Sequence, residues 1–182
     1  DHDLMEWASN SLFEVDGDFL ITDEGIASLE VDEENNKAIV KIREGVKWSD
    51  GEPLKIEDLI LPYKIIADKD YEGVRYDGDL QNIIGMEEYH AGTADTISGL
   101  VKVDETTLEM SFKKLSPAIY SGGDGLWTYA APTHQIGDIP VAELLSHDVV
   151  RKNPVTLGAF KFDKVVPGET VQYVANEHYW KG

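Results

Sequence analysis

The chain carries the stretch Val46-Lys47-Trp48-Ser49-Asp50-Gly51-Glu52-Pro53 between two segments with different hydrophobic patterns. The preceding residues 39–43 alternate apolar and basic side chains, as a half-buried strand does. The following residues 56–61 are mostly apolar, with acidic side chains near the start, which favours a helix. The serine, aspartate and glycine of the stretch are turn formers, and its proline ends a strand. The sequence here predicts a strand, a tight turn and a helix.

Working outward, three pairs of alternating segments joined by polar turn residues predict three antiparallel hairpins. They pair residues 28–31 with 38–43, 100–103 with 108–112, and 160–162 with 171–174. The first two pairs are expected to form the main sheet. Helical spacing predicts helices over residues 56–67, 80–91 and 140–146. Pro62 is expected to kink or shorten the first helix, because proline removes an amide donor. Hairpins mixed with helices predict an α+β fold.

The composition is that of a globular and strongly acidic chain. Of its 182 residues, 42% are hydrophobic and 28% are charged, and the net charge is -19. This length allows one substantial core, or one domain with a smaller appendage. The acidic excess argues against binding to nucleic acid, whose backbone is bound by clustered lysine and arginine. The chain has no cysteine, which excludes disulfides and thiolate metal sites, and no cofactor is expected.

Three stretches resemble signatures of one family, the peptide/nickel class of ABC-transporter substrate-binding proteins. The turn at residues 46–53 is similar to its "GVKWSDGEP", residues 153–162 to its "NPVGTGPYKF", and residues 166–180 to its "VPGESV" followed by "NPDYW". Residues 85–92 look most like oligopeptide-binding lipoproteins of Gram-positive bacteria. Where the family has threonine, this chain has Lys55, which cannot accept an amide hydrogen bond. The cap of the following helix is therefore expected to be weaker or placed elsewhere.

The resemblance implies the small lobe of a periplasmic-binding-protein type II-like fold and a function in binding, without enzymatic chemistry. Because family members are much longer, the chain is expected to be an internal fragment. Residues 1–133 would form the small second lobe, and residues 134–182 would belong to the first lobe. Two lobes would close over an oligopeptide, and ABC permease subunits would recognise the closed form. The implied location is the extracellular face of the cell membrane, through a lipid anchor outside this chain, or the periplasm of a Gram-negative bacterium.

Three aromatic residues are candidates for ligand contact: Tyr76, Trp127 and Tyr129. They lie in segments rich in glycine and aspartate that are predicted to be loops, where binding residues concentrate. Such rings can lie on an extended peptide and still form a hydrogen bond at the tip. The alternative for each is a partly buried loop anchor. In the related oligopeptide binders a tyrosine after the signature helix lies against the peptide, and Tyr76 is the nearest candidate. Trp48 is expected to be structural.

The alternative function is a calcium-binding surface or adhesion module. The spacing of an EF-hand loop recurs at residues 68–79, with oxygen-bearing side chains at positions 1, 3, 5 and 12 and glycine at position 6. These side chains are Asp68, Asp70, Glu72 and Asp79. Tight binding is not expected, because aspartate is shorter than the glutamate that normally supplies two oxygens. A carboxylate-dependent hydrolase is a third hypothesis, but no nucleophile motif or zinc-binding histidine pattern supports an enzyme.

Overall fold

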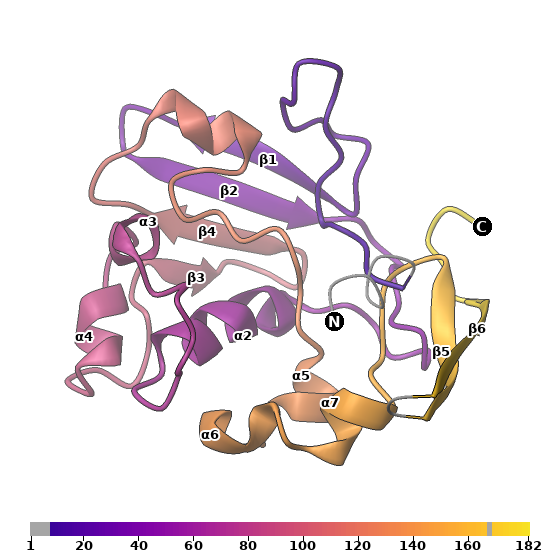
Figure 1. The fold of residues 1–182 in the computed structure, drawn as a ribbon. Coiled ribbons are helices and arrows are strands. Elements are labelled where there is room, and N and C mark those ends of the chain that lie inside the picture. The colour runs from indigo at the N-terminus through magenta and orange to yellow at the C-terminus, as the bar shows by residue number, and fades with distance from the viewer. Residues whose placement is uncertain (1–7, 167–168) are drawn as a thin grey trace. The chain divides into compact units, whose positions relative to one another are not determined.

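The computed structural model describes residues 8–166 and 169–182 and divides the chain into two compact units (Figure 1). The larger unit holds residues 11–44 and 55–130 and is called the sheet unit below. The smaller unit holds residues 45–54 and 131–182 with the described end of residues 1–10, and is called the hairpin unit. The assignment of residues 1–133 and 134–182 to lobes of a larger protein stays a prediction.

The sheet unit is built on four antiparallel strands in the order β1-β2-β4-β3. Their bounds are β1 Ala27–Asp32, β2 Lys37–Ile42, β3 Leu100–Lys102 and β4 Thr107–Ser111. The two hairpins expected for the main sheet are therefore confirmed, and β2 joins them by pairing with β4. In this register Val40 lies between Leu29 of β1 and Leu108 of β4, so apolar side chains of neighbouring strands share one face.

The core of the sheet unit lies on that apolar face. Alternate strand residues are buried there, which are Ala38, Val40, Ile42, Leu108 and Met110. Helix α2 (Ile56–Ala67) covers the face beside β3 and contributes the buried Leu59, Tyr63 and Ile66 (Figure 1). Full burial of side chains of this size stabilises a fold by roughly 1.5–3 kcal/mol each. The period-2 pattern of the strands and the helical period of α2 thus meet in one core.

Helix α2 has the predicted bounds and is not shortened at Pro62, while a kink there stays a prediction. Pro62 lies inside the helix and is buried, and the helix continues to Ala67. The cap is placed elsewhere, as expected from Lys55. The backbone N–H of Lys55 donates to the Asp58 carboxylate at 3.0 Å, so the third helical residue supplies the acceptor.

The single helix predicted over residues 80–91 is wrong, because two short helices occupy this segment. They are α3 (Gly78–Gln81) and α4 (Met86–His90). Between them Gly85 has a φ of 81°, a left-handed conformation that ends helical geometry. The N–H of Ile84 donates to Ser111 at the end of β4, and Ile83 forms a bridge with Phe112. Pairing with the sheet therefore replaces the helical hydrogen bonds.

A short 3-10 helix, η1 (Pro117–Ser121), follows β4. Its N-cap is Ser116, whose hydroxyl accepts from the N–H of Ala118 and donates to the Asp124 carboxylate at 2.9 Å. The side chain of Tyr120 donates to Glu33 in the β1–β2 turn at 3.0 Å. These bonds fix the start of the segment that leads to Trp127.

The described part of the hairpin unit contains the third predicted hairpin and three short helices. The strands are β5 (Phe160–Val166) and β6 (Thr170–Ala175), and part of their turn, Pro167 and Gly168, lies outside the described residues. The helices are α5 (Thr133–Ile136), α6 (Val141–Leu144) and α7 (Asp148–Lys152). The helix predicted over residues 140–146 is α6, which is shorter and begins after Pro140.

The signature-like stretches of the sequence bind one another inside the hairpin unit. Ser49 and Thr156 form a reciprocal pair, in which the Ser49 N–H donates to the Thr156 carbonyl and the Thr156 N–H to Ser49 Oγ, at 2.9 and 3.1 Å. The Asn176 side chain donates to the Gly158 carbonyl at 2.8 Å. Trp48 is only 3% exposed, in agreement with a structural role. These motifs therefore hold the unit together.

Candidate functional site

The three candidate aromatic residues lie on two loops of the sheet unit, residues 71–77 and 122–130, which are called the paired loops below. Gly125 brings the second loop against α3, the helix that follows the first loop. Its φ is +85°, and a Cβ at this position would lie 2.5 Å from the carbonyl oxygen of Asp79. Only glycine permits this close approach. Across the paired loops, Cζ of Arg75 lies 5.9 Å from the centroid of the Trp127 ring.

Trp127 is fixed by a buried tyrosine of α2. Its backbone N–H donates to the Tyr63 hydroxyl oxygen at 2.7 Å. Burial raises the pKa of Tyr63, because the phenolate is disfavoured away from water, while the bond from Trp127 acts in the opposite direction. The hydroxyl therefore stays protonated and points towards Met110 Sδ, 4.0 Å away. The Trp127 side chain is half-buried, with one side in contact with the core.

The backbone after Trp127 is extended and paired along one side. The carbonyl of Thr128 accepts from the N–H of Leu12 at 2.7 Å, and the carbonyl of Leu12 accepts from Ala27 at the same distance. Within the described residues, no protein group accepts a hydrogen bond from the N–H of Thr128, Tyr129 or Ala130. Tyr129 is 47% exposed. This segment thus presents backbone donors next to an exposed aromatic ring.

Tyr76 lies on α4 through a stacked contact. Its ring centroid is 3.9 Å from that of His90, with 25° between the planes. His90 is held in turn, because its Nδ1 lies 3.0 Å from the carbonyl oxygen of Ala67. Partial burial raises the pKa of Tyr76, and the negative charge of Glu87 raises it further. The Tyr76 hydroxyl is therefore a neutral donor at physiological pH, on a ring that is half-buried.

The structure thus brings Trp127 and Tyr129 onto one loop and places Arg75, the neighbour of Tyr76, over Trp127. Ligand contact by Tyr76, Trp127 and Tyr129 stays a prediction. Sequence reasoning did not select Arg75, because its contact with Trp127 joins residues far apart in the chain and leaves no local pattern. The only signal was a basic residue where an EF-hand loop usually has an apolar one.

The acidic segment at residues 68–79 is organised by local hydrogen bonds. The Asp68 carboxylate accepts from the N–H of Asp70 at 2.8 Å, and the Asp70 carboxylate pairs with Lys69. The Asp77 carboxylate caps α3 by accepting from Asp79 and Leu80. In the described part of the chain, no three His, Asp or Glu side chains gather as a metal site would require. The absence of tight calcium binding stays a prediction.

Two further findings concern the kind of protein. Among the described helices, none combines the length and the apolar character needed to cross a bilayer. A sequence profile of the bacterial extracellular solute-binding proteins, family 5 Middle, matches residues 22–182. The chain belongs to this family. The resemblance predicted from the signature stretches is thereby confirmed.

Curated relatives of this chain are named as oligopeptide-binding proteins. OppA of Lactococcus lactis subsp. cremoris (strain SK11) is 33% identical over 175 residues, which cover 94% of this chain and 29% of that protein. AppA of Bacillus subtilis (strain 168) is 27% identical over 143 residues, which cover 79% of this chain and 23% of AppA. The chain therefore spans less than a third of the length of these relatives.

Solved structures of relatives share the fold. Lactococcal OppA, complexed with an endogenous peptide in the closed conformation, matches with a TM-score of 0.90 and 30% identity over 97% of this chain and 36% of that one. AppA from Bacillus subtilis, in complex with a nonapeptide, matches with a TM-score of 0.77 at 24% identity, covering 100% of this chain and 33% of that one. The predicted α+β fold of the periplasmic-binding-protein type II-like class is confirmed.

Proposed function

We propose that this chain is part of a longer extracellular binding protein that captures oligopeptides and delivers them to an ABC importer. Membership of the solute-binding family and the names of its relatives support this function. The role is binding without catalysis, because those relatives are binding proteins of transport systems. The calcium-dependent adhesion module has no support among the relatives or in the arrangement of the described acidic side chains.

The observation that carries the proposal is the surface of the paired loops. An extended peptide needs partners for its backbone and space for varied side chains. Thr128, Tyr129 and Ala130 offer backbone N–H groups without a protein acceptor among the described residues. Trp127 precedes them with a half-buried ring on a fixed backbone, and the half-buried ring of Tyr76 is held against His90 on the other loop. Amphipathic rings of this kind bind a peptide without strict dependence on its sequence.

In the mechanism we propose, the paired loops form one wall of a cleft and the missing lobe of the parent protein forms the other. Peptide favours the closed form only to the extent that it binds that form more tightly than the open one. The permease subunits then recognise the closed form. The proposed location is the outer face of the cell membrane, through a lipid anchor elsewhere in the parent protein, or the periplasm in a Gram-negative bacterium.

The test uses the intact parent protein and isothermal titration with peptide. Replacing Tyr76→Ala is expected to weaken binding by about 1–2 kcal/mol, because a non-central aromatic contact is lost. The matched control is Tyr120→Ala, since Tyr120 is also a partly exposed tyrosine of the sheet unit but its hydroxyl is bonded to Glu33. Unchanged affinity in the Tyr76 variant, or equal losses in both variants, would contradict the site.

The 182-residue chain alone gives a second test. It is expected to show no measurable peptide affinity, because a single wall cannot enclose the ligand backbone. Tight binding by this chain alone would contradict the two-walled mechanism, and it would be seen directly in the same titration.

A further inference from the structure

Among the described residues, the guanidinium of Arg75 has no carboxylate partner. Five lysines of the sheet unit, namely Lys37, Lys41, Lys69, Lys102 and Lys113, each form an ion pair with Asp or Glu. Across the described residues, Arg75 makes no such pair, although Glu72, Asp77 and Asp79 lie near it in the sequence. Lys55, Lys64 and Lys114 likewise form no ion pair among the described residues, so the feature of Arg75 to explain is its place over an aromatic ring.

The geometry explains how the charge is kept unpaired. The Asp77 carboxylate is engaged with the N-terminus of α3, where it accepts from Asp79 and Leu80. The N–H of Asp77 also donates to the Arg75 carbonyl at 3.0 Å, which fixes the backbone at this point. The guanidinium instead lies over the Trp127 ring, with Cζ 5.9 Å from its centroid. Arg75 is exposed, so its remaining hydrogen-bond donors face solvent.

This arrangement leaves the N–H donors of the guanidinium available to a ligand. A cation–π contact is electrostatic and uses none of the five N–H donors of arginine. Those donors lie in a planar fork that matches the two oxygens of a carboxylate. The Trp127 ring under the guanidinium supplies apolar surface next to that fork.

We propose that Arg75 binds a carboxylate of the peptide, and that its place over the Trp127 ring makes this surface select peptides that present one there. This inference rests on the proposed function, since it gives a chemical preference to the same surface. The carboxylate is either the C-terminus of the peptide or an Asp or Glu side chain. Arg75 is thus a specificity-determining residue of the paired loops.

The experiment uses the intact parent protein and pools of random nonapeptides, so that no single sequence limits the result. One pair of pools contains no Asp or Glu and ends either in a free carboxylate or in a carboxamide. A second pair ends in carboxamide and contains at one position either Glu or Gln. Retained peptide is measured by mass spectrometry after gel filtration. At least one carboxylate pool is expected to be retained about 5- to 20-fold better than its neutral partner, as for a charge-assisted bond.

Variants of Arg75 connect that preference to the residue. Arg75→Gln is expected to abolish the preference, so that the two pools of each pair are retained equally. Arg75→Lys is expected to keep only part of it, because lysine lacks the planar fork. The control is Lys55→Gln, which removes the same charge outside the paired loops, at the N-cap of α2. The control should keep the full preference.

The outcomes distinguish carboxylate selection by Arg75 from peptide capture as such. Discrimination in the first pair of pools identifies the C-terminus as the source of the carboxylate, and discrimination in the second identifies the side chain. Equal retention of all pools by the wild-type protein, or a preference that survives in Arg75→Gln, overturns the inference and leaves peptide capture intact. Failure to retain any pool overturns the proposed function and the inference with it.

Discussion

Trp48 is buried at the turn that joins β2 to α2, with its ring 6.3 Å from that of His134. Its backbone N–H donates to the Glu52 carbonyl at 2.8 Å, which closes the turn below the ring. Replacing Trp48→Ala is expected to lower the free energy of unfolding by about 3–5 kcal/mol, because a large cavity is left in the hairpin unit. Denaturant unfolding measures this loss. Tyr129→Ala is the control, since an exposed ring should change stability little; an unchanged Trp48 variant would contradict the structural role.

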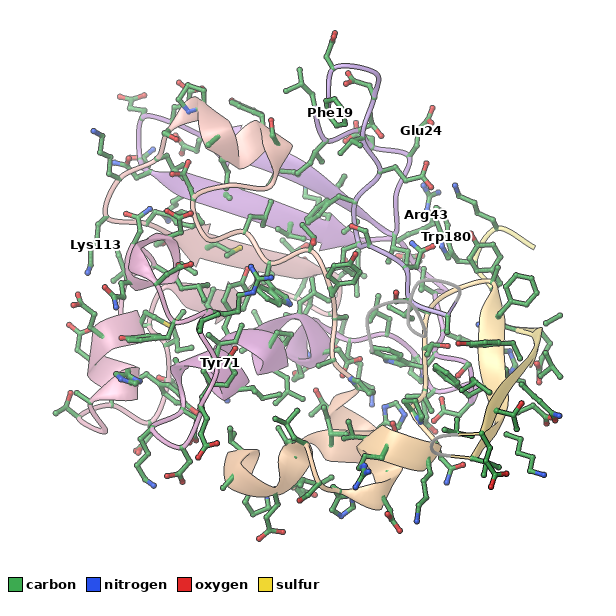
Figure 2. The ribbon with its side chains drawn as sticks, in the orientation of Figure 1. Phe19, Glu24, Arg43, Tyr71, Lys113 and Trp180 are labelled. Carbon is green, nitrogen blue, oxygen red and sulfur yellow. The ribbon has the colours of Figure 1, made fainter. Side chains whose placement is uncertain are left out.

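Phe19 has an unusual backbone for an aromatic residue. It is 74% exposed, with a φ of 63°, in the loop that projects beyond β1 (Figure 2). Its N–H donates to the Asp16 carbonyl at 3.1 Å, and the N–H of Asp16 donates to the Leu20 carbonyl at 2.9 Å. These bonds close a three-residue loop between Asp16 and Leu20, and Phe19 is its last, left-handed residue. Replacing Phe19→Asn is expected to stabilise the chain by about 1 kcal/mol, because asparagine tolerates this conformation. Phe19→Ala keeps the strain and should give no gain in thermal unfolding; equal effects of both changes would contradict the argument.

At the scale of elements, α2 depends on a cap supplied from inside the helix. Asp58 is only 1% exposed and accepts the N–H of Lys55. Replacing Asp58→Ala is expected to destabilise the sheet unit by about 1 kcal/mol or more, since the donor loses its acceptor. Asp58→Asn keeps an acceptor and should retain most of the stability. Urea unfolding compares the two variants, and an equal loss in both would point to charge rather than to the cap.

Comparison of the predicted and observed elements shows which of them a sequence can predict. The three hairpins were predicted correctly, because alternation and turn residues are adjacent in the chain. The helix expected over residues 80–91 failed because Ile83 and Ile84 pair with the end of β4, a contact that no local period reveals. In the candidate site, too, local patterns were predicted and a contact between distant residues was not. Loop composition selected Trp127, whereas Arg75 becomes notable only when the fold places it over that ring.

At the scale of the whole molecule, the net charge of -19 predicts a response to salt. Like charges repel most strongly in the compact state, and salt screens this repulsion. Salt also weakens the surface ion pairs, but such pairs contribute only about 0–1 kcal/mol each. Raising sodium chloride is therefore expected to stabilise the chain by about 1 kcal/mol, a rise in Tm of roughly 2–4 °C. A fall in Tm would show that the ion pairs outweigh the repulsion.

A comparison of calcium with sodium separates charge screening from specific binding. Screening is the same for salts of equal ionic strength, whereas a calcium site would raise the Tm only with calcium. The four candidate ligands at residues 68–79 include no glutamate at the last position, and the Asp70 carboxylate is already paired with Lys69. Calcium chloride and sodium chloride at matched ionic strength are therefore expected to give the same Tm. Asp70→Asn should leave that equality unchanged. An additional shift with calcium that Asp70→Asn removes would establish a calcium site and contradict the prediction.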